Sequence, residues 1–418
     1  MKKKYFIVGL IFITFFVISF ITNILGALNP DIISTFKLSL TLSAFLPFAF
    51  FIAYGIMSIP AGLLVEKYKE KRIMVFAFGI ALVGAIMFFL FPFYQIFIIS
   101  LFLMGTGMAM LQVAINPLLR VAGGEEHFAF NSVMAQLVFG GASFLAPMFL
   151  TKMIADLKDG ANTDFMILQL RDYVNSTTSW VAIYFTFAVM LLFMIIFVGL
   201  SKFPKVERSE IEKSGNWTIH KELFKNKIVV LYFLGIFAYV GTEQGVSYWL
   251  SKFLVTYHNY DPITIGSSIV GWFWGMMAIG CMVGLGLLKL FDSRKILIAS
   301  SILSLIFLTI ALHGDGSLSL MFFPLMGFSL SVMWSIIFSL ALNSLKNHHG
   351  TFSGILCTAI IGGAVVQLII GWLGDLFGLR IGLYFIYITL GYILSVGFWS
   401  NPIITNETIS AKNNSQIN

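Results

Sequence analysis

The sequence predicts an all-α membrane protein with twelve transmembrane helices in two pseudo-symmetric six-helix bundles. Three observations predict this fold. Hydrophobic residues make up 58% of the 418 residues and charged residues only 11%, which is too little charge for the surface of a soluble protein of this length. Twelve apolar segments each approach the roughly 20 residues that a helix needs to cross a bilayer. Similar features also recur at matching points of the two halves of the chain.

The twelve segments divide the chain into two bundles, a linker and a tail. We expect the first six at about 5–28, 41–64, 73–92, 95–119, 129–154 and 179–200. The second six are expected at about 228–254, 263–290, 295–313, 317–344, 351–374 and 380–400. The predicted domains are an N-terminal bundle (1–200), a polar, lysine-rich cytoplasmic linker (201–227), a C-terminal bundle (228–400) and a disordered cytoplasmic tail rich in Asn and Ser (401–418).

The basic residues predict the orientation of these segments. With the N-terminus inside, 20 of the 26 Lys and Arg residues fall on the cytoplasmic side, as the positive-inside rule requires. The run after Lys2–Lys4 is too long for a cleaved signal peptide and is interpreted as the first spanning helix. We therefore expect a multi-pass protein of the cell inner (plasma) membrane with both termini in the cytoplasm. The net charge of +7 then reflects contact with the lipid bilayer and not with nucleic acid.

Short motifs match between the two halves. A shift of 222 residues places Gly140–Ala142 on Gly362–Ala364, and a shift of 223 places Lys71–Ile73 on Arg294–Ile296. The duplicated six-helix half resembles the major facilitator pattern, in which the substrate is held near the membrane midplane between the halves. Coincidence in apolar sequence of low complexity is the alternative.

One acidic residue, Glu243, lies deep inside a predicted span, whereas the other 18 acidic residues fall in loops, in tails or at helix ends. A charged side chain at the bilayer centre costs about 2.5–3.5 kcal/mol on insertion scales. Such residues face a polar cavity or pathway by default, so we interpret Glu243 as a functional group. The alternative is a protonated or hydrogen-bonded glutamic acid that ties two helices together.

Polar side chains recur on single faces of several predicted spans. Gln112, Asn116 and Arg120 follow at intervals of four in the fourth span, and Tyr239 and Glu243 share a face of the seventh. Further groups predicted to face the same central site are Asn23, Gln136, Trp272 and Gln367.

Amides, hydroxyls and indoles are the groups that a neutral polyol requires. They hydrogen-bond several hydroxyls while an aromatic face stacks on the apolar side of a sugar ring. No stripe of Lys or Arg appears within the spans, which makes a strongly anionic substrate a poorer fit. For any single residue, helix–helix adhesion is the alternative role.

Three stretches resemble the fucose permease-type sugar symporters of the major facilitator superfamily: Leu111–Pro117, Phe237–Glu243 and Ser58–Gly62. The resemblance covers helices one to eleven. It implies twelve helices, a central sugar site and uptake driven by a cation gradient. Gly62–Arg72 is also similar to the superfamily's loop signature, although Lys69 stands where that signature usually has a small residue.

The chain departs from that family at two positions. Gln112 stands where the helix-four motif usually has a Glu, and the helix-one acid falls on Gly26 when the chain is aligned without gaps. Asp31 lies five residues later and can substitute only if the register shifts. An amide can hydrogen-bond a sugar but cannot carry a proton. Glu243 is therefore the candidate for cation coupling, with H+ or Na+ as the ion.

These observations predict a secondary active transporter that imports a neutral monosaccharide of the fucose, hexose or N-acetylhexosamine type by alternating access. The alternative is a major facilitator transporter for a non-sugar solute, such as an exporter of amphipathic compounds. An enzyme is not expected, because no zinc-protease spacing or nucleophile elbow is present. We expect no cofactor, no metal and a monomer, with Asn23, Gln112, Asn116, Gln136, Tyr239, Glu243, Trp272 and Gln367 as the substrate-binding residues.

Overall fold

The structure, a computed structural model, describes residues 2–123, 128–159, 165–174, 178–203, 217–345 and 348–403, and contains no β-strand within them. The first half consists of α1 (Lys2–Thr22), α2 (Leu25–Phe36), α3 (Leu40–Tyr68), α4 (Glu70–Leu90), α5 (Tyr94–Gly123), α6 (Phe128–Lys158), α7 (Phe165–Tyr173), the 3₁₀ turn η2 (Ser179–Ala182) and α8 (Ile183–Leu200). The second half follows α9 (Trp217–Lys225) and consists of α10 (Lys227–His258), η4 (Pro262–Gly266), α11 (Ser267–Leu290), α12 (Ser293–His313), α13 (Gly316–Leu330), α14 (Met333–Leu342), α15 (His349–Thr358), η5 (Ala359–Ile361), α16 (Gly362–Phe377), α17 (Leu379–Leu383) and α18 (Phe385–Trp399).

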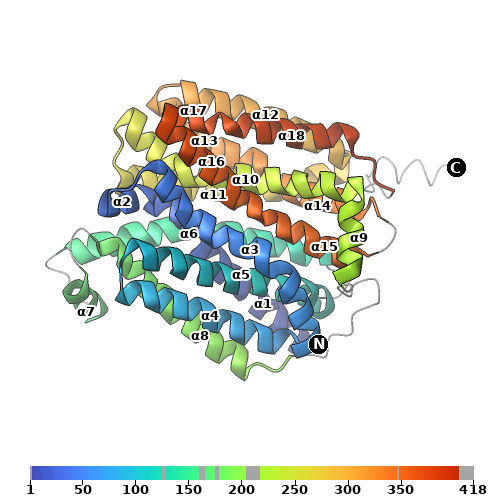
Figure 1. The fold of residues 1–418 in the computed structure, drawn as a ribbon, viewed down its shortest axis with the longest axis horizontal. Coiled ribbons are helices and arrows are strands. Elements are labelled where there is room, and N and C mark those ends of the chain that lie inside the picture. The colour runs from blue at the N-terminus through green and yellow to red at the C-terminus, as the bar shows by residue number, and fades with distance from the viewer. Residues whose placement is uncertain are drawn as a thin grey trace.

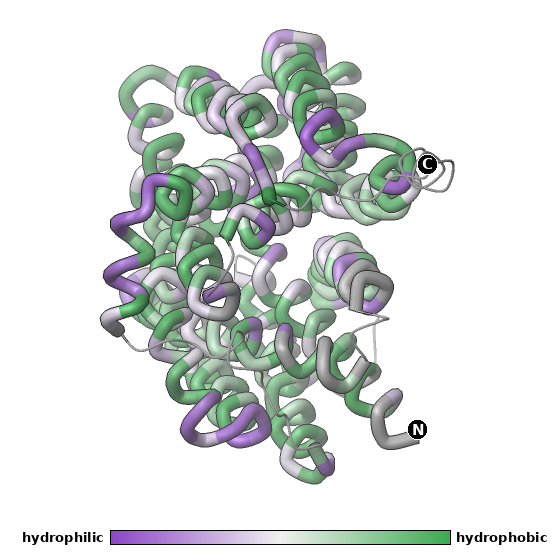
Figure 2. The backbone as a smooth tube through the Cα atoms, turned by 90° about the vertical axis from the view of Figure 1, so that its right-hand side faces the viewer, coloured by the Kyte–Doolittle hydropathy of each residue, from purple (hydrophilic) through white to green (hydrophobic). Residues whose placement is uncertain are grey.

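Twelve helical stretches of the described chain are long and apolar enough to cross a membrane, which confirms the predicted number of spans. The first stretch runs from Tyr5 to Phe36 and is longer than expected, because α2 continues α1 after a turn at Asn23 and Ile24. Along the backbone, apolar residues dominate the helices and polar residues concentrate at their ends (Figure 2). This distribution matches a bundle whose sides face lipid and whose ends face water.

The helices form two bundles that lie one above the other in Figure 1. Within the first bundle α4 packs on α5 and α8, α3 on α5, and α1 on α6; within the second, α11 and α12 pack on α13, and α10 on α16 and α18. The bundles meet where α6 packs on α11, α3 on α16, and α2 on α10. We call the side with the start of α1 and the end of α18 the terminal side, and the opposite side, with the end of α2 and the start of α3, the distal side (Figure 1).

Small residues lie where the bundles cross, and they include the motif that the two halves share. Gly140 of α6 faces Ala278 of α11, and a Cβ added at Gly140 would lie 2.8 Å from the Ala278 Cβ. In the second copy of the motif, Gly363 of α16, one residue after the match to Gly140, faces the ring of Phe51 on α3. The glycines of the repeated motif therefore allow close contact between bundles on two opposite faces of the interface.

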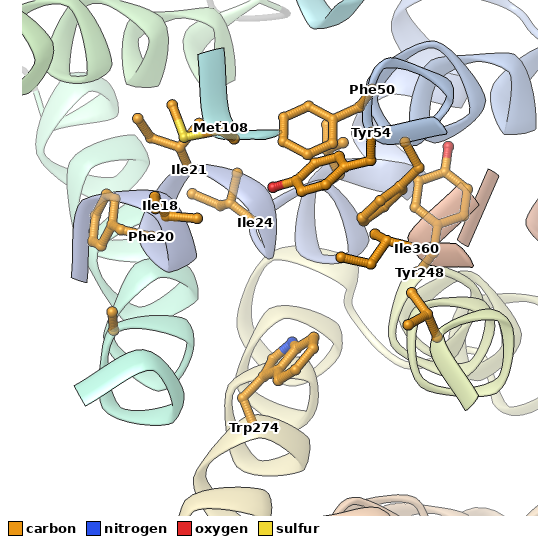
Figure 3. Packing of buried hydrophobic residues seen from close by; sticks show 14 of the residues in the cluster. Ile18, Phe20, Ile21, Ile24, Phe50, Tyr54, Met108, Tyr248, Trp274 and Ile360 are labelled. Carbon is orange, nitrogen blue, oxygen red and sulfur yellow. The ribbon is translucent and has the colours of Figure 1, made fainter. Parts of the chain in front are cut away.

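The interior between the bundles is filled by aromatic and branched side chains. Phe50 and Tyr54 of α3 lie beside Ile24, while Trp274 of α11 approaches from the other bundle (Figure 3). Phe50, Ile24 and Trp274 are at most 1% exposed. These residues belong to one hydrophobic core that includes side chains from both bundles.

The terminal side carries three features: helix α9, the turn at Lys69 and the cap at Asp292. Residues 217–225 of the expected linker form α9, which packs on α10 and α15; residues 204–216 and 404–418 lie outside the described residues.

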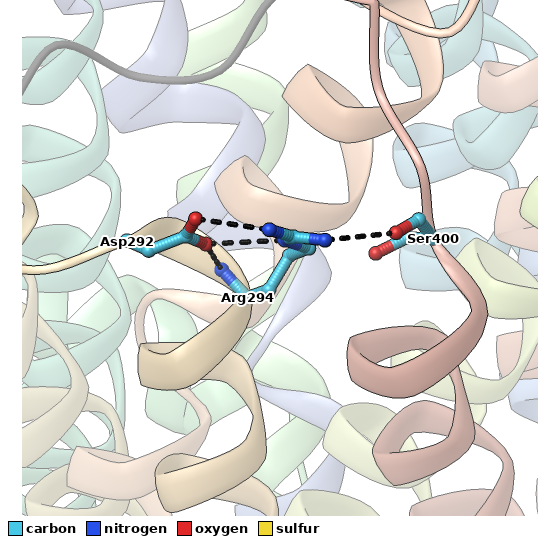
Figure 4. A network of polar contacts seen from close by, with 3 residues as sticks. All are labelled: Asp292, Arg294 and Ser400. Carbon is cyan, nitrogen blue, oxygen red and sulfur yellow. Dashed lines mark hydrogen bonds and ion pairs between the residues drawn. The ribbon is translucent and has the colours of Figure 1, made fainter.

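Lys69 joins α3 to α4 with φ of 72°, a left-handed conformation that favours small residues and explains why the loop signature usually has one there. Asp292 caps α12 and bonds Arg294, whose guanidinium reaches the Ser400 carbonyl after α18 (Figure 4).

Candidate functional site

Glu243 lies in the middle of α10, which is 32 residues long and crosses the whole bundle. Tyr239 lies one helical turn earlier on the same face, and its hydroxyl donates a hydrogen bond of 2.8 Å to Glu243 Oε1. The Tyr239 side chain is 2% exposed, whereas Glu243 is half-buried. Tyr239 also packs against the half-buried Trp334 of α14, with ring centroids 6.0 Å apart. The carboxyl group therefore has a fixed donor on one side and is partly accessible on the other.

Gln244 connects this carboxyl group to the first bundle. Its Nε2 lies 3.4 Å from Glu243 Oε2 and 3.3 Å from Asn23 Oδ1, so one amide group serves both acceptors. Asn23 lies at the turn between α1 and α2, where the helix is interrupted. Its own Nδ2 donates to Ser143 Oγ of α6 at 2.8 Å, which fixes the orientation of the Asn23 amide. Ser143 in turn bonds Ser19 of α1.

These contacts form a continuous polar chain across the centre of the molecule. It runs from Tyr239 through Glu243 and Gln244 to Asn23 and Ser143, and thus from the second bundle to the first. Hydrogen-bond chains of this kind transmit a change of charge at one end to the donors and acceptors at the other. Glu243 therefore shares one hydrogen-bonded chain with residues of both bundles.

A small cavity, with room for about one water molecule, lies beside this chain. It lies between α1, α2, α3, α10 and α16, and its lining residues are Thr22, Asn23, Leu25, Gly26, Pro47, Phe51, Gln244, Ser247, Tyr248 and Gln367. The Gln367 side chain is 1% exposed, and its Oε1 has no hydrogen-bond partner among the described residues. A buried amide oxygen without a partner indicates a place where a bound solute or water supplies the missing donor.

The distal side of this cavity is closed by polar contacts between the bundles. The Tyr248 hydroxyl lies 2.7 Å from both the carbonyl and the hydroxyl oxygen of Ser43 on α3. Asn29 of α2 donates to the Tyr248 carbonyl at 2.9 Å and accepts from the Ser43 hydroxyl at 2.8 Å. Gly26 of α2 lies directly against the Ser247 carbonyl. These contacts join α2, α3 and α10 across the interface of the two bundles on the distal side of the cavity.

The structure brings together four of the eight predicted site residues. Tyr239, Glu243 and Asn23 belong to the polar chain, and Gln367 lines the cavity together with Asn23. Gln244, Ser247 and Tyr248 also belong to this centre but were not among the predicted site residues. Their position directly after Glu243 within an apolar span was the signal that could have identified them.

The other four predicted residues are not joined to this chain by a hydrogen bond within the described part of the protein. On α5, Gln112 is half-buried and Asn116 is exposed; on α6, Gln136 is half-buried. Trp272 of α11 is 47% exposed and makes an edge-to-face contact with Phe144. Their role in substrate binding stays a prediction.

Gly26 and Asp31 differ sharply in their surroundings. A Cβ at Gly26 would lie within 3.0 Å of the Ser247 carbonyl carbon and closer still to its oxygen, so no acid fits there in this conformation. Asp31 is half-buried on α2 and is not among the residues that line the cavity.

Within the described ranges, no group of three or more His, Cys, Asp or Glu side chains could hold a metal ion.

Two six-helix bundles, with a half-buried acid and a small cavity lined in part by amide and hydroxyl side chains between them, are typical of a membrane transporter. The family model described as Major Facilitator Superfamily matches residues 11–360. The chain belongs to this superfamily, and it is a transporter and not an enzyme.

Individual relatives agree with the predicted resemblance. The glucose/galactose transporter of Brucella abortus is 32% identical over 396 residues, which cover 92% of this chain and 91% of that protein. The L-fucose-proton symporter of Escherichia coli is 24% identical over 379 residues, covering 86% and 85%. The crystal structure of the E. coli fucose:proton symporter FucP (N162A) matches with a TM-score of 0.70 and 20% identity, over 96% of this chain and 99% of that chain, and confirms the fold.

Proposed function

We propose that this transporter carries a neutral monosaccharide of the glucose, galactose or fucose type and imports it by alternating access. The observation that carries the proposal is the buried Gln367 oxygen without a partner, which lies in a cavity shared with the amides of Asn23 and Gln244. Uncharged amides and hydroxyls recognise sugar hydroxyls without requiring charge on the ligand. The names of the relatives, glucose/galactose transporter and L-fucose-proton symporter, support the same class of solute.

The proposed cation site is Glu243. An ionised Glu243 accepts hydrogen bonds from Tyr239 and Gln244, whereas a protonated one has an O–H to donate and accepts less strongly. Gln244, which already contacts Asn23, is then released from the carboxyl group and can bond a sugar in the cavity. Proton binding and sugar binding thereby act on the same amide group, which is the proposed basis of coupling. A sodium ion bound at the carboxylate would compete for the same Gln244 and Tyr239 contacts.

The orientation is part of this proposal. The terminal side is placed in the cytoplasm, with both chain ends there, because it carries most of the Lys and Arg residues. The distal side then faces outward across the cell inner membrane. The transporter is proposed to act as a monomer, because the polar chain and the cavity are both completed within one chain.

Uptake into proteoliposomes tests the proposal. Radiolabelled D-glucose, D-galactose, L-fucose and N-acetylglucosamine are offered under an imposed proton gradient, an imposed sodium gradient, or neither. We expect the unaltered protein to concentrate at least one sugar under one of the two gradients. Glu243→Gln keeps the size and hydrogen bonding of the side chain but cannot ionise, so it should exchange sugar across the membrane without concentrating it.

Glu222→Gln, an exposed acid on α9, is the matched control and should behave as the unaltered protein. Concentrative uptake that is unchanged in Glu243→Gln would remove this residue from the coupling mechanism. The failure of the unaltered protein to move any of the four sugars would overturn the proposed substrate class.

A further inference from the structure

The first turn of α3, at the distal side of the first bundle, depends on the second bundle for its hydrogen bonds. A helix begins with backbone N–H groups that have no partner within the helix. Ser39 caps α3, with its hydroxyl accepting from the Leu42 N–H at 3.2 Å, and its carbonyl accepts from the Ser43 N–H at 3.0 Å. The N–H groups of Leu40 and Thr41 remain to be satisfied.

Asp375 of α16 supplies both missing acceptors. Its Oδ1 accepts from the Leu40 N–H and its Oδ2 from the Thr41 N–H, each at 2.8 Å. The carboxylate therefore binds the positive end of the α3 dipole with both oxygens. Hydrogen bonds to a charged acceptor are about twice as strong as neutral ones. Because Asp375 and α3 belong to different bundles, these two bonds join the bundles at their distal edge.

Glycines bring the carboxylate within reach. Gly371 lies one turn before Asp375, and a Cβ there would lie 2.7 Å from the Leu40 carbonyl oxygen and 2.9 Å from the Ala44 Cβ. A Cβ at Gly374 would lie 2.8 Å from Leu40 Cδ1. Helix α16 thus presents almost no side-chain bulk to the start of α3, and any added methyl at Gly371 would push against backbone.

We propose that Asp375 is a positioning residue that holds the distal side closed and sets the fraction of time that the transporter is closed on this side. We call its two hydrogen bonds to the Leu40 and Thr41 N–H groups the latch. For the distal side to open, α16 must move away from the start of α3. Both bonds to Asp375 then break, and Leu40 and Thr41 expose their N–H groups to water. The latch therefore favours the distally closed conformation, whichever solute the cavity holds.

Distance measurements between spin labels test the latch. Labels are attached at Gln95→Cys and Ser317→Cys, exposed positions at the distal starts of α5 and α13, after Cys281→Ser and Cys357→Ser. The protein is studied in lipid nanodiscs without added substrate. We expect Asp375→Ala to raise the population of a longer distance roughly two- to fivefold, the range for an exposed charge at a helix terminus. Asp375→Asn, which keeps one acceptor oxygen but no charge, should give a smaller rise.

Gly371→Ala tests the same latch without touching the carboxylate. It should also raise the population of the longer distance, because its methyl group holds α16 away from Leu40. Gly391→Ala is the matched control, since a Cβ at Gly391 has no neighbour within 4 Å, and it should leave the distances unchanged. The latch is overturned if Asp375→Asn and Gly371→Ala, both eluting as single folded species, give the distances of the unaltered protein. This outcome leaves the proposed sugar substrate untouched, since no sugar enters the measurement.

Discussion

The resemblance to the fucose permease-type symporters predicts that Gly26 stands in place of their helix-one acid when the chain is aligned without gaps. From the sequence this looks like the loss of a functional group. In the structure the position has a packing role as well, because Gly26 lies against the Ser247 carbonyl of the other bundle. The close approach of α2 and α10 therefore excludes any side chain there. The carboxyl group of the central polar chain belongs to Glu243, which lies one helical turn before Ser247 on α10.

Gly26→Ala should impair closure of the distal side. Its Cβ would need to displace the backbone of α10 and not a flexible side chain, and overpacking of this kind typically costs about 1–3 kcal/mol. We expect a lower melting temperature and a large loss of sugar exchange in proteoliposomes. Gly9→Ala, whose Cβ would have no neighbour within 4 Å, is the control and should retain both. Full exchange activity in Gly26→Ala would show that this close contact is not needed for transport.

At the scale of elements, the interruptions of the spans place the functional groups. The turn between α1 and α2 places Asn23 where its amide faces both α6 and α10. A second interruption at Ser331 and Val332 separates α13 from α14, which carries Trp334 towards Tyr239. Irregular backbone within a membrane is tolerated where protein or a cavity covers it. These breaks are consistent with a site built at the centre of the bundle.

The cap of α12 gives a pH dependence that can be checked. Partial burial raises the pKa of Asp292, but the bonds from the Arg294 side chain and N–H outweigh it and hold the pKa below the ordinary value of 3.8. Because the pKa of Asp292 is lower in the folded protein than in the unfolded chain, ionised Asp292 stabilises the fold at pH values above 3.8. This stabilisation is lost as the pH falls through the pKa of Asp292 in the folded protein. Asp292→Asn should therefore melt earlier than the unaltered protein at pH 7, and the difference should vanish in acid.

Melting curves of both proteins between pH 7 and about pH 3 measure this difference, a range that includes the ordinary carboxyl pKa. Comparing the two proteins cancels the titration of the other carboxyl groups. A difference that stays constant over the whole range would contradict the assigned role of the Asp292–Arg294 pair.

At the scale of the whole molecule, composition and charge were sufficient to predict the fold. Twelve spans and two related bundles follow from apolar length and from the repeated glycine motif, because lipid leaves few other solutions for such a chain. The extension of the first span to Phe36 was not predicted, since Asn29 and Asp31 make its end look polar. In the structure Asn29 is buried and bonded to Ser43 and Tyr248.

The candidate site was predictable only in part. Glu243 stands out because a buried acid is costly, and Tyr239 follows from helical spacing. Spacing along one helix does not determine how that helix is rotated against its neighbours. For this reason the amides of α5 and the indole of Trp272 could not be placed from sequence. Gln244 was overlooked as a site residue because it directly follows Glu243, and spacing at intervals of four along the helix does not select it.

We propose that sugar binds at the cavity between Asn23, Gln244 and Gln367. Calorimetric titration of the purified protein with D-galactose and D-glucose tests it most directly, with Gln367→Leu and the exposed-site control Gln95→Leu measured in parallel. We predict saturable binding that is weakened about tenfold or more in Gln367→Leu, the loss expected for a buried hydrogen bond, and is unchanged in Gln95→Leu. Equal affinity in Gln367→Leu and the unaltered protein would contradict this placement of the sugar.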